Sequence, residues 1–170
     1  MPPTVVPEVL VPALRARPLP ALATAVALGL TLALGAGPVP SVEAASGLRF
    51  TTFVADPSGK DDRSNAHLNR EKITVKNTGR STVSLSGYTV KDKQNHTFTF
   101  PKGVSLKSGK SLTVHTGKGT NTSTHLYWGR GNYVWNNTPG DKATLRNSRG
   151  SVQDTCTFTA SKHRSGTVDC

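Results

Sequence analysis

Short runs in which apolar and polar residues alternate make up most of the chain after residue 47, and turn-forming residues separate them. The run Glu71–Asn77, for example, places Ile73 and Val75 on one face and charged or polar side chains on the other. A two-residue period is that of a half-buried strand, and the helical period of 3.6 residues is almost absent. The runs that predict strands are Leu48–Val54, Glu71–Asn77, Val83–Leu85, Gly87–Asp92, His96–Pro101, Ser111–Thr116, Ala143–Arg146 and Val152–Phe158. Roughly seven to nine short strands at this spacing predict an all-β sandwich or barrel.

The first 44 residues have a different composition from the rest of the chain. Arg15 and Arg17 precede an uncharged segment, Ala21–Gly37, and small residues follow in Val42-Glu43-Ala44. This order predicts a secretory signal peptide over residues 1–44, cleaved after Ala44. The alternative is an uncleaved membrane anchor, for which the apolar segment is short. We therefore expect a secreted protein without membrane contact after cleavage, with one domain over residues 45–160 and a tail over 161–170.

Positive charge is the main chemical feature of the expected mature chain. The whole chain has a formal net charge of +11. Two basic and two acidic residues lie in residues 1–44, so residues 45–170 keep the same excess. Such a surface attracts anionic polymers such as nucleic acid or cell-wall polymers, although charge often serves solubility alone. The candidate polyanion-binding residues are Lys91, Lys93, Lys102, Lys107, Lys110, Lys118, Arg130, Lys142, Arg146 and Arg149.

Sequence-specific reading of DNA is not expected. The cations are spread along the chain, and the aromatic residues do not interleave with them as in a groove for single strands. Contacts with phosphates would be nonspecific and sensitive to salt.

The two cysteines, Cys156 and Cys170, both lie in the part expected to be exported. In an oxidising compartment an even number of cysteines indicates a disulfide. A loop this short would stabilise the fold by about 3 kcal/mol in the chain-entropy model, and it would tie the C-terminal tail to the last predicted strand.

No catalytic motif is present among the histidines, serines and acidic residues. The five histidines have no zinc-ligand spacing, and there is no Gly-x-Ser-x-Gly motif. One segment is rich in oxygen ligands, and calcium prefers six to eight oxygens. The candidate ligands of this alternative metal site are Asp56, Asp61, Asp62, Asn65 and Glu71. Turn formation explains the same residues without a metal, so we expect no cofactor.

Four aromatic residues lie close together in the sequence: Tyr127, Trp128, Tyr133 and Trp135. Trp135 precedes a turn and is interpreted as an anchor in the core or a loop. The alternative is an exposed aromatic shelf on which sugars stack, which requires the rings to be exposed and coplanar.

Several motifs occur in an order that goes beyond simple alternation. They are Glu71-x-Ile73-x-Val75-x-Asn77-x-Gly79, Val83-x-Leu85-x-Gly87-Tyr88-x-Val90-x-Asp92, Phe98-x-Phe100-Pro101, Leu106-x-x-Gly109-x-x-Leu112-x-Val114-x-Thr116-Gly117-x-Gly119, Trp128-Gly129, Trp135-Asn136-Asn137-x-x-Gly140-Asp141-x-Ala143-x-Leu145 and Gly150-x-Val152-x-Asp154. Together they resemble the lamin-tail domain, also called the lamin immunoglobulin-like domain, over roughly residues 48–158.

This resemblance implies an immunoglobulin-like β-sandwich of the kind found in exported bacterial proteins. Tyr88 stands where the family more often has tryptophan, and the segment from Cys156 to Cys170 lies outside the shared pattern. We expect a monomeric, non-enzymatic binding or structural module whose partner is an anionic polymer or another protein. The alternative is an extracellular hydrolase or nuclease that uses calcium in the Asp56–Glu71 loop.

Overall fold

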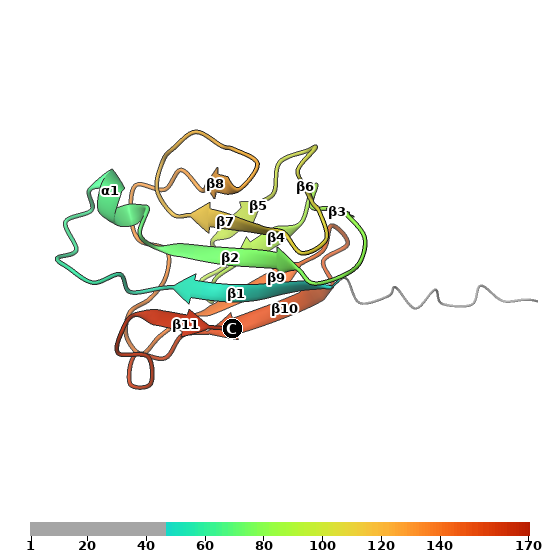
Figure 1. The fold of residues 1–170 in the computed structure, drawn as a ribbon. Helices are drawn as coiled ribbons and strands as arrows, with labels where there is room; N and C mark the ends of the chain where they lie inside the picture. The colour runs from blue at the N-terminus through green and yellow to red at the C-terminus, as the bar shows by residue number, and fades with distance from the viewer. Residues whose placement is uncertain (1–46) are drawn as a thin grey trace, which may run out of the picture. The chain divides into compact units, whose positions relative to one another are not determined.

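The computed structural model describes residues 47–170, which fold almost entirely as β-structure (Figure 1). The elements are β1 Leu48–Val54, α1 Asn65–Leu68, β2 Lys72–Asn77, β3 Val83–Ser84, β4 Thr89–Lys91, β5 Thr97–Thr99, β6 Ser105–Leu106, β7 Ser111–His115, β8 His125–Tyr127, β9 Lys142–Arg146, β10 Val152–Thr157 and β11 Thr167–Asp169. Every predicted strand is present. The helical turn α1 and the short strands β6, β8 and β11 were not predicted.

The strands form two main sheets that pack as an immunoglobulin-like sandwich (Figure 1). The five-stranded sheet has the order β11-β1-β2-β7-β8, and β8 alone runs parallel to its neighbour. The four-stranded sheet has the order β10-β9-β4-β5 and is antiparallel throughout. A two-stranded ribbon of β3 and β6 completes the fold.

The core lies between the two sheets and contains the inward half of each alternating run. Ile73 and Val75 of β2 are fully buried, and so are Val90 of β4 and Leu145 of β9. Residues from both sheets and from the connecting loops belong to this one hydrophobic cluster. Burial of apolar area is the main driving force for such a sandwich, which explains why the alternation predicted its strands.

A buried asparagine holds the connection between the strands β2 and β3. Asn77 is fully buried, and its Nδ2 donates to the carbonyl oxygens of Ser81 and Leu106 at 2.7 and 2.8 Å. Its Oδ1 accepts from the Gly79 N–H at 2.9 Å. One side chain thus satisfies three backbone groups, which stabilises the turn expected at Asn77-Thr78-Gly79.

The predicted disulfide between Cys156 and Cys170 is present, with a Cα–Cα distance of 5.7 Å. Cys156 lies on β10, an edge strand of the four-stranded sheet. Cys170 follows β11, an edge strand of the five-stranded sheet. The bond therefore joins the two sheets. The tail also contains a strand that was not predicted, because β11 pairs with β1.

The predicted signal peptide over residues 1–44 lies outside the described residues. Within residues 47–170, no helix is long and apolar enough to span a lipid bilayer.

Candidate functional site

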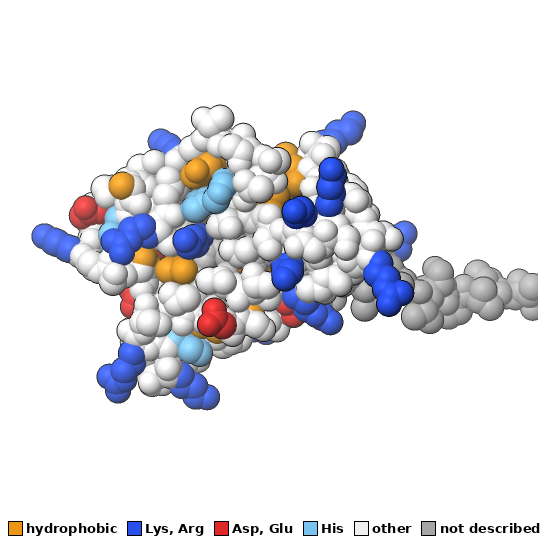
Figure 2. Space-filling view, in the orientation of Figure 1, with side chains coloured by type: hydrophobic (Ala, Val, Ile, Leu, Met, Phe, Trp, Pro, Cys, Tyr) orange, Lys and Arg blue, Asp and Glu red, His pale blue; other side chains and the backbone are white. Residues whose placement is uncertain are grey.

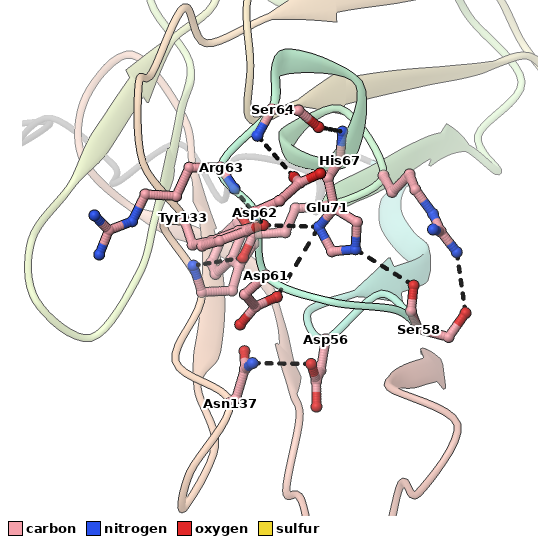
Figure 3. A network of polar contacts seen from close by, with 12 residues as sticks. Asp56, Ser58, Asp61, Asp62, Arg63, Ser64, His67, Glu71, Tyr133 and Asn137 are labelled. Carbon is pink, nitrogen blue, oxygen red and sulfur yellow. Dashed lines mark hydrogen bonds and ion pairs between the residues drawn. The ribbon is translucent and has the colours of Figure 1, made fainter.

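The Asp56–Glu71 loop, which offered the candidate metal ligands, does not bring them together (Figure 3). Asp56 Oδ1 accepts from the side-chain amide of Asn137, whereas Asp62 Oδ1 accepts from the Ser64 N–H, both at 2.8 Å. Asn65 bonds the backbone of Lys118 through both side-chain atoms. No group of three or more His, Cys, Asp or Glu side chains suited to a metal ion occurs in residues 47–170. Asp56, Asp62 and Asn65 are thus engaged in hydrogen bonds within the protein, an arrangement that favours the structural interpretation of this loop.

His67 lies at the centre of the polar network in this loop (Figure 3). It is 7% exposed, and its Nε2 lies 3.3 Å from the carbonyl oxygen of Ser58. Its Nδ1 lies 2.7 Å from the Tyr133 hydroxyl and 4.0 Å from an Asp61 carboxylate oxygen. Because Ser58 O can only accept, Nε2 carries a proton, and in the neutral ring Nδ1 accepts from the hydroxyl. Both ring nitrogens therefore have partners, and the ring links α1 to the loop before β9.

Glu71 points into the protein just before β2 begins. It is fully buried, and its two carboxylate oxygens accept from the N–H groups of Val134 and Trp135 at 3.0 and 3.3 Å. Burial disfavours the charged form and raises the pKa of Glu71 to about 8, although these hydrogen bonds oppose the shift. The residue holds a loop in place and is not available to bind a ligand at the surface.

Other carboxylates are also buried and accept from backbone N–H groups. Asp141 is fully buried and accepts from the N–H groups of Lys93, Asn136 and Lys142. Asp92 is 6% exposed and accepts from the backbone of His96 in the β4–β5 turn. Among the described residues, no lysine or arginine is buried to this degree. The surface is therefore more positive than the formal charge suggests.

The outer face of the four-stranded sheet carries cations and threonines and no carboxylate. Lys91 of β4 pairs across the sheet with Thr97 and Thr144, and Arg146 of β9 pairs with Thr89. Lys142 pairs with Thr157 of β10. We call this surface the basic sheet face. Its residues are Thr89, Lys91, Thr97, Thr99, Lys142, Thr144, Arg146, Val152, Thr155 and Thr157.

The three cations of this face are available for ligands. No ion pair within residues 47–170 involves Lys91, Lys142 or Arg146. The Arg146 guanidinium donates to the carbonyl oxygen of Gly150 at 2.8 Å, which orients it and leaves further N–H groups. Lys91 is diagonal to both other cations across the β4–β9 pair, a separation of about 7–8 Å at the backbone. The charges are thus spread over a flat surface.

The remaining candidate cations occupy other parts of the domain. Lys93 lies in the β4–β5 turn, next to the basic sheet face, and Arg149 lies in the β9–β10 turn. Lys102 follows β5. The others are attached to the five-stranded sheet or its loops: Lys107, Lys110, Lys118 and Arg130. The structure therefore places only three of the ten candidates on the basic sheet face and spreads the others over turns, loops and the five-stranded sheet.

The four aromatic residues do not form one exposed, coplanar shelf. Trp135 is 3% exposed and packs edge-on against Phe53, with ring centres 4.6 Å apart. Trp128 is half-buried and meets Trp135 at 76° between ring planes. Tyr127 stacks on His115, and Tyr133 contacts His67. The anchor interpretation of Trp135 therefore matches its position, and the shelf does not form because the rings turn in different directions.

A comparison with known protein families assigns the sandwich to one of them. Residues 41–160 match the family model described as Lamin Tail Domain, which covers well over half of the chain. The chain belongs to the Lamin Tail Domain family. No match was found among the curated proteins. In this lamin-tail domain, the matched segment contains the whole basic sheet face, whereas β11 and Cys170 lie beyond it.

The cations of this lamin-tail domain are predictable from the sequence, but their grouping on one sheet is not. Lys142 and Arg146 are four residues apart in one alternating run, so their shared face was readable from the sequence. The position of Lys91 beside them was not, because β4 and β9 are far apart in the chain. The inward acids Glu71 and Asp141 were also missed, since polar residues in such runs are usually exposed.

Proposed function

We propose that this lamin-tail domain is an exported, non-catalytic binding module that holds anionic polymers on the basic sheet face. The observation that carries the proposal is the combination of three cations and six threonines on one sheet, without a single carboxylate. Acidic residues that would neutralise the surface, such as Glu71 and Asp141, are buried instead.

The chemistry of this face suits phosphate, sulfate or carboxylate groups along a flexible polymer. Lys91 and Lys142 supply point charges, Arg146 supplies a planar set of donors, and threonine hydroxyls add neutral hydrogen bonds. A broad, flat sheet does not enter the major groove of DNA, which admits a helix or a two-stranded ribbon. Binding is therefore expected to follow charge rather than base sequence, and to weaken with salt.

Export of the domain is part of the proposal. The disulfide between Cys156 and Cys170 is supporting evidence, because such bonds persist in oxidising compartments. The signal-like composition of residues 1–44 points the same way. We propose that the exported domain is monomeric.

We propose that the domain is not catalytic, and the arrangement of its polar groups supports this. Asp56 and Asp62 accept hydrogen bonds from Asn137 and Ser64, and His67 has partners on both ring nitrogens. This arrangement supports a binding role over the hydrolase or nuclease alternative.

Binding to a panel of polymers tests this function. Duplex DNA, a teichoic acid and heparin would be titrated with the protein at about 50 and 200 mM salt, and each polymer would be checked for cleavage. We expect binding at low salt, no cleavage, and a loss of roughly tenfold or more in affinity at high salt. Cleavage of any polymer would overturn the proposal. So would the absence of measurable binding to all three polyanions at low salt.

Charge-matched variants locate the binding surface. The triple variant K91Q/K142Q/R146Q removes three charges from the basic sheet face. The control K107Q/K110Q/K118Q removes three charges elsewhere, so the net charge of the two proteins is equal. We expect the first variant to lose about tenfold more affinity than the control, and to reduce the slope of log K against log salt by about two to three. Equal losses would mean that net charge alone drives binding.

A further inference from the structure

A pocket lined by cationic residues lies on the other side of the sandwich, at the end of the five-stranded sheet nearest α1. This pocket of about 270 Å³ lies between the end of β1, the start of β2 and the start of β11. Figure 2 shows cationic side chains beside a small hydrophobic surface in this region. The pocket is distinct from the basic sheet face, because the two lie on different sheets.

Two cations line this pocket, and no acidic residue does. Arg70 follows α1, and its Nη2 donates to Ser58 Oγ at 3.0 Å, which holds the guanidinium at the rim. Lys72 is the first residue of β2 and pairs with Val54 of β1 on one side and His115 of β7 on the other. Neither cation forms an ion pair within residues 47–170.

The walls of the pocket are held in place by hydrogen bonds. The carbonyl oxygen of Ser58 bonds His67 Nε2, while its hydroxyl accepts from Arg70. On the opposite wall, the N–H groups of Ala55 and Asp56 both donate to the carbonyl oxygen of Gly166. Gly166 has φ of +74°, and a side chain there would clash with the carbonyl oxygen of Asp56. The pocket is therefore preformed rather than assembled on binding.

The lining combines charge, hydroxyl groups and a small apolar surface. Ser165 and Thr167 also line the pocket and carry hydroxyl groups, and Val54 and Pro57 supply apolar atoms. A guanidinium presents several donors in one plane and binds tetrahedral oxyanions through two of them. The pocket volume of about 270 Å³ is far above the roughly 10–15 Å³ that a cavity needs to hold one water molecule, so an oxyanion fits together with the small group that carries it.

We propose that this pocket, the Arg70 pocket, binds a phosphate-type oxyanion. The phosphate is either free or esterified to a small polar group such as glycerol. Arg70 provides the directional contacts, Lys72 the second charge, and the hydroxyls of Ser165 and Thr167 the neutral donors. The inference does not depend on the proposed function, since no residue is shared with the basic sheet face.

Chemical-shift titration of the ¹⁵N-labelled protein tests this site. The probes are inorganic phosphate, glycerol phosphate and, as the uncharged control, glycerol. We expect saturable shifts of the amides of Ser58, Arg70 and Thr167 with both phosphates and none with glycerol. Tighter binding of glycerol phosphate would identify an ester as the ligand, and equal binding would identify the oxyanion alone.

Two variants on the same surface distinguish phosphate binding in the pocket from general electrostatic attraction to the protein. R70Q removes the guanidinium, and K76Q removes a charge from the outer face of β2 outside the pocket. Because Arg70 is exposed, R70Q is expected to fold, which the unchanged remainder of its spectrum would verify. We expect R70Q to weaken phosphate binding about tenfold and K76Q to leave it unchanged. Equal binding by wild type and R70Q, or shifts that are uniform and never saturate, would overturn the proposal.

Discussion

The buried carboxylate of Glu71 accepts a hydrogen bond from the backbone N–H of Val134 at 3.0 Å, although the two residues are 63 positions apart in the chain. A second N–H, that of Trp135, reaches the other carboxylate oxygen. The contact fixes the loop before β9 against the start of β2. Because the group is titratable and buried, it makes the stability of the fold depend on pH.

Replacing Glu71 by Gln should flatten the pH dependence of stability. The pKa of Glu71 is about 8 in the folded protein, whereas its ordinary value, which applies to the unfolded chain, is 4.5. The folded state therefore binds the proton more tightly. The contribution of Glu71 is thus complete below pH 4.5 and is lost as the pH rises toward 8, at up to about 1.4 kcal/mol per pH unit. Urea unfolding of wild type and E71Q at several pH values measures this. Parallel curves for the two proteins would contradict the shifted pKa.

Removing the disulfide should destabilise the domain and free its last strand. In the double variant C156A/C170A, the expected loss is about 3 kcal/mol, because the unfolded chain is no longer constrained. Hydrogen exchange should accelerate most at Val168, which pairs with Phe53 of β1. The reduced wild-type protein is the matched comparison and should behave like the variant. Unchanged exchange at Val168 would mean that β11 holds without the bond.

Truncation of the aromatic residues should separate a core anchor from surface rings. Trp135 is buried against Phe53 and Trp128, so W135A should cost about 3–5 kcal/mol in the free energy of unfolding. Tyr127 stacks on His115 on the outer side of β8 and is only partly buried, so Y127A should cost much less. Chemical denaturation of both variants gives the comparison. Similar small losses would show that Trp135 is not a core residue.

The strands and the core could be predicted from the sequence because burial imposes a two-residue period on them. Ile73, Val75, Val90 and Leu145 are all inward, as the alternation indicated. The strand β8 could not be predicted in this way, because it is three residues long and its parallel pairing with β7 is decided by tertiary contacts. The same holds for β11, which forms where the chain returns to β1.

The candidate site was predictable only as a set of residue types. The excess of lysine and arginine indicated a basic surface, and the alternation in β9 places Lys142 and Arg146 on one face. Their assembly with Lys91 depends on the pairing of β4 with β9, which no local pattern encodes. The burial of Glu71 also escaped prediction, because its partners are backbone groups of a distant loop.

Lysine footprinting of a complex with a polyanion tests the central claim most directly. The protein would be acetylated with and without a saturating teichoic acid, and the modification of each lysine would be measured by mass spectrometry. The basic sheet face predicts that Lys91 and Lys142 are protected several-fold, whereas Lys107, Lys110 and Lys118 stay reactive. Uniform protection of all five lysines, or protection confined to the last three, would contradict the assignment of this face as the binding surface.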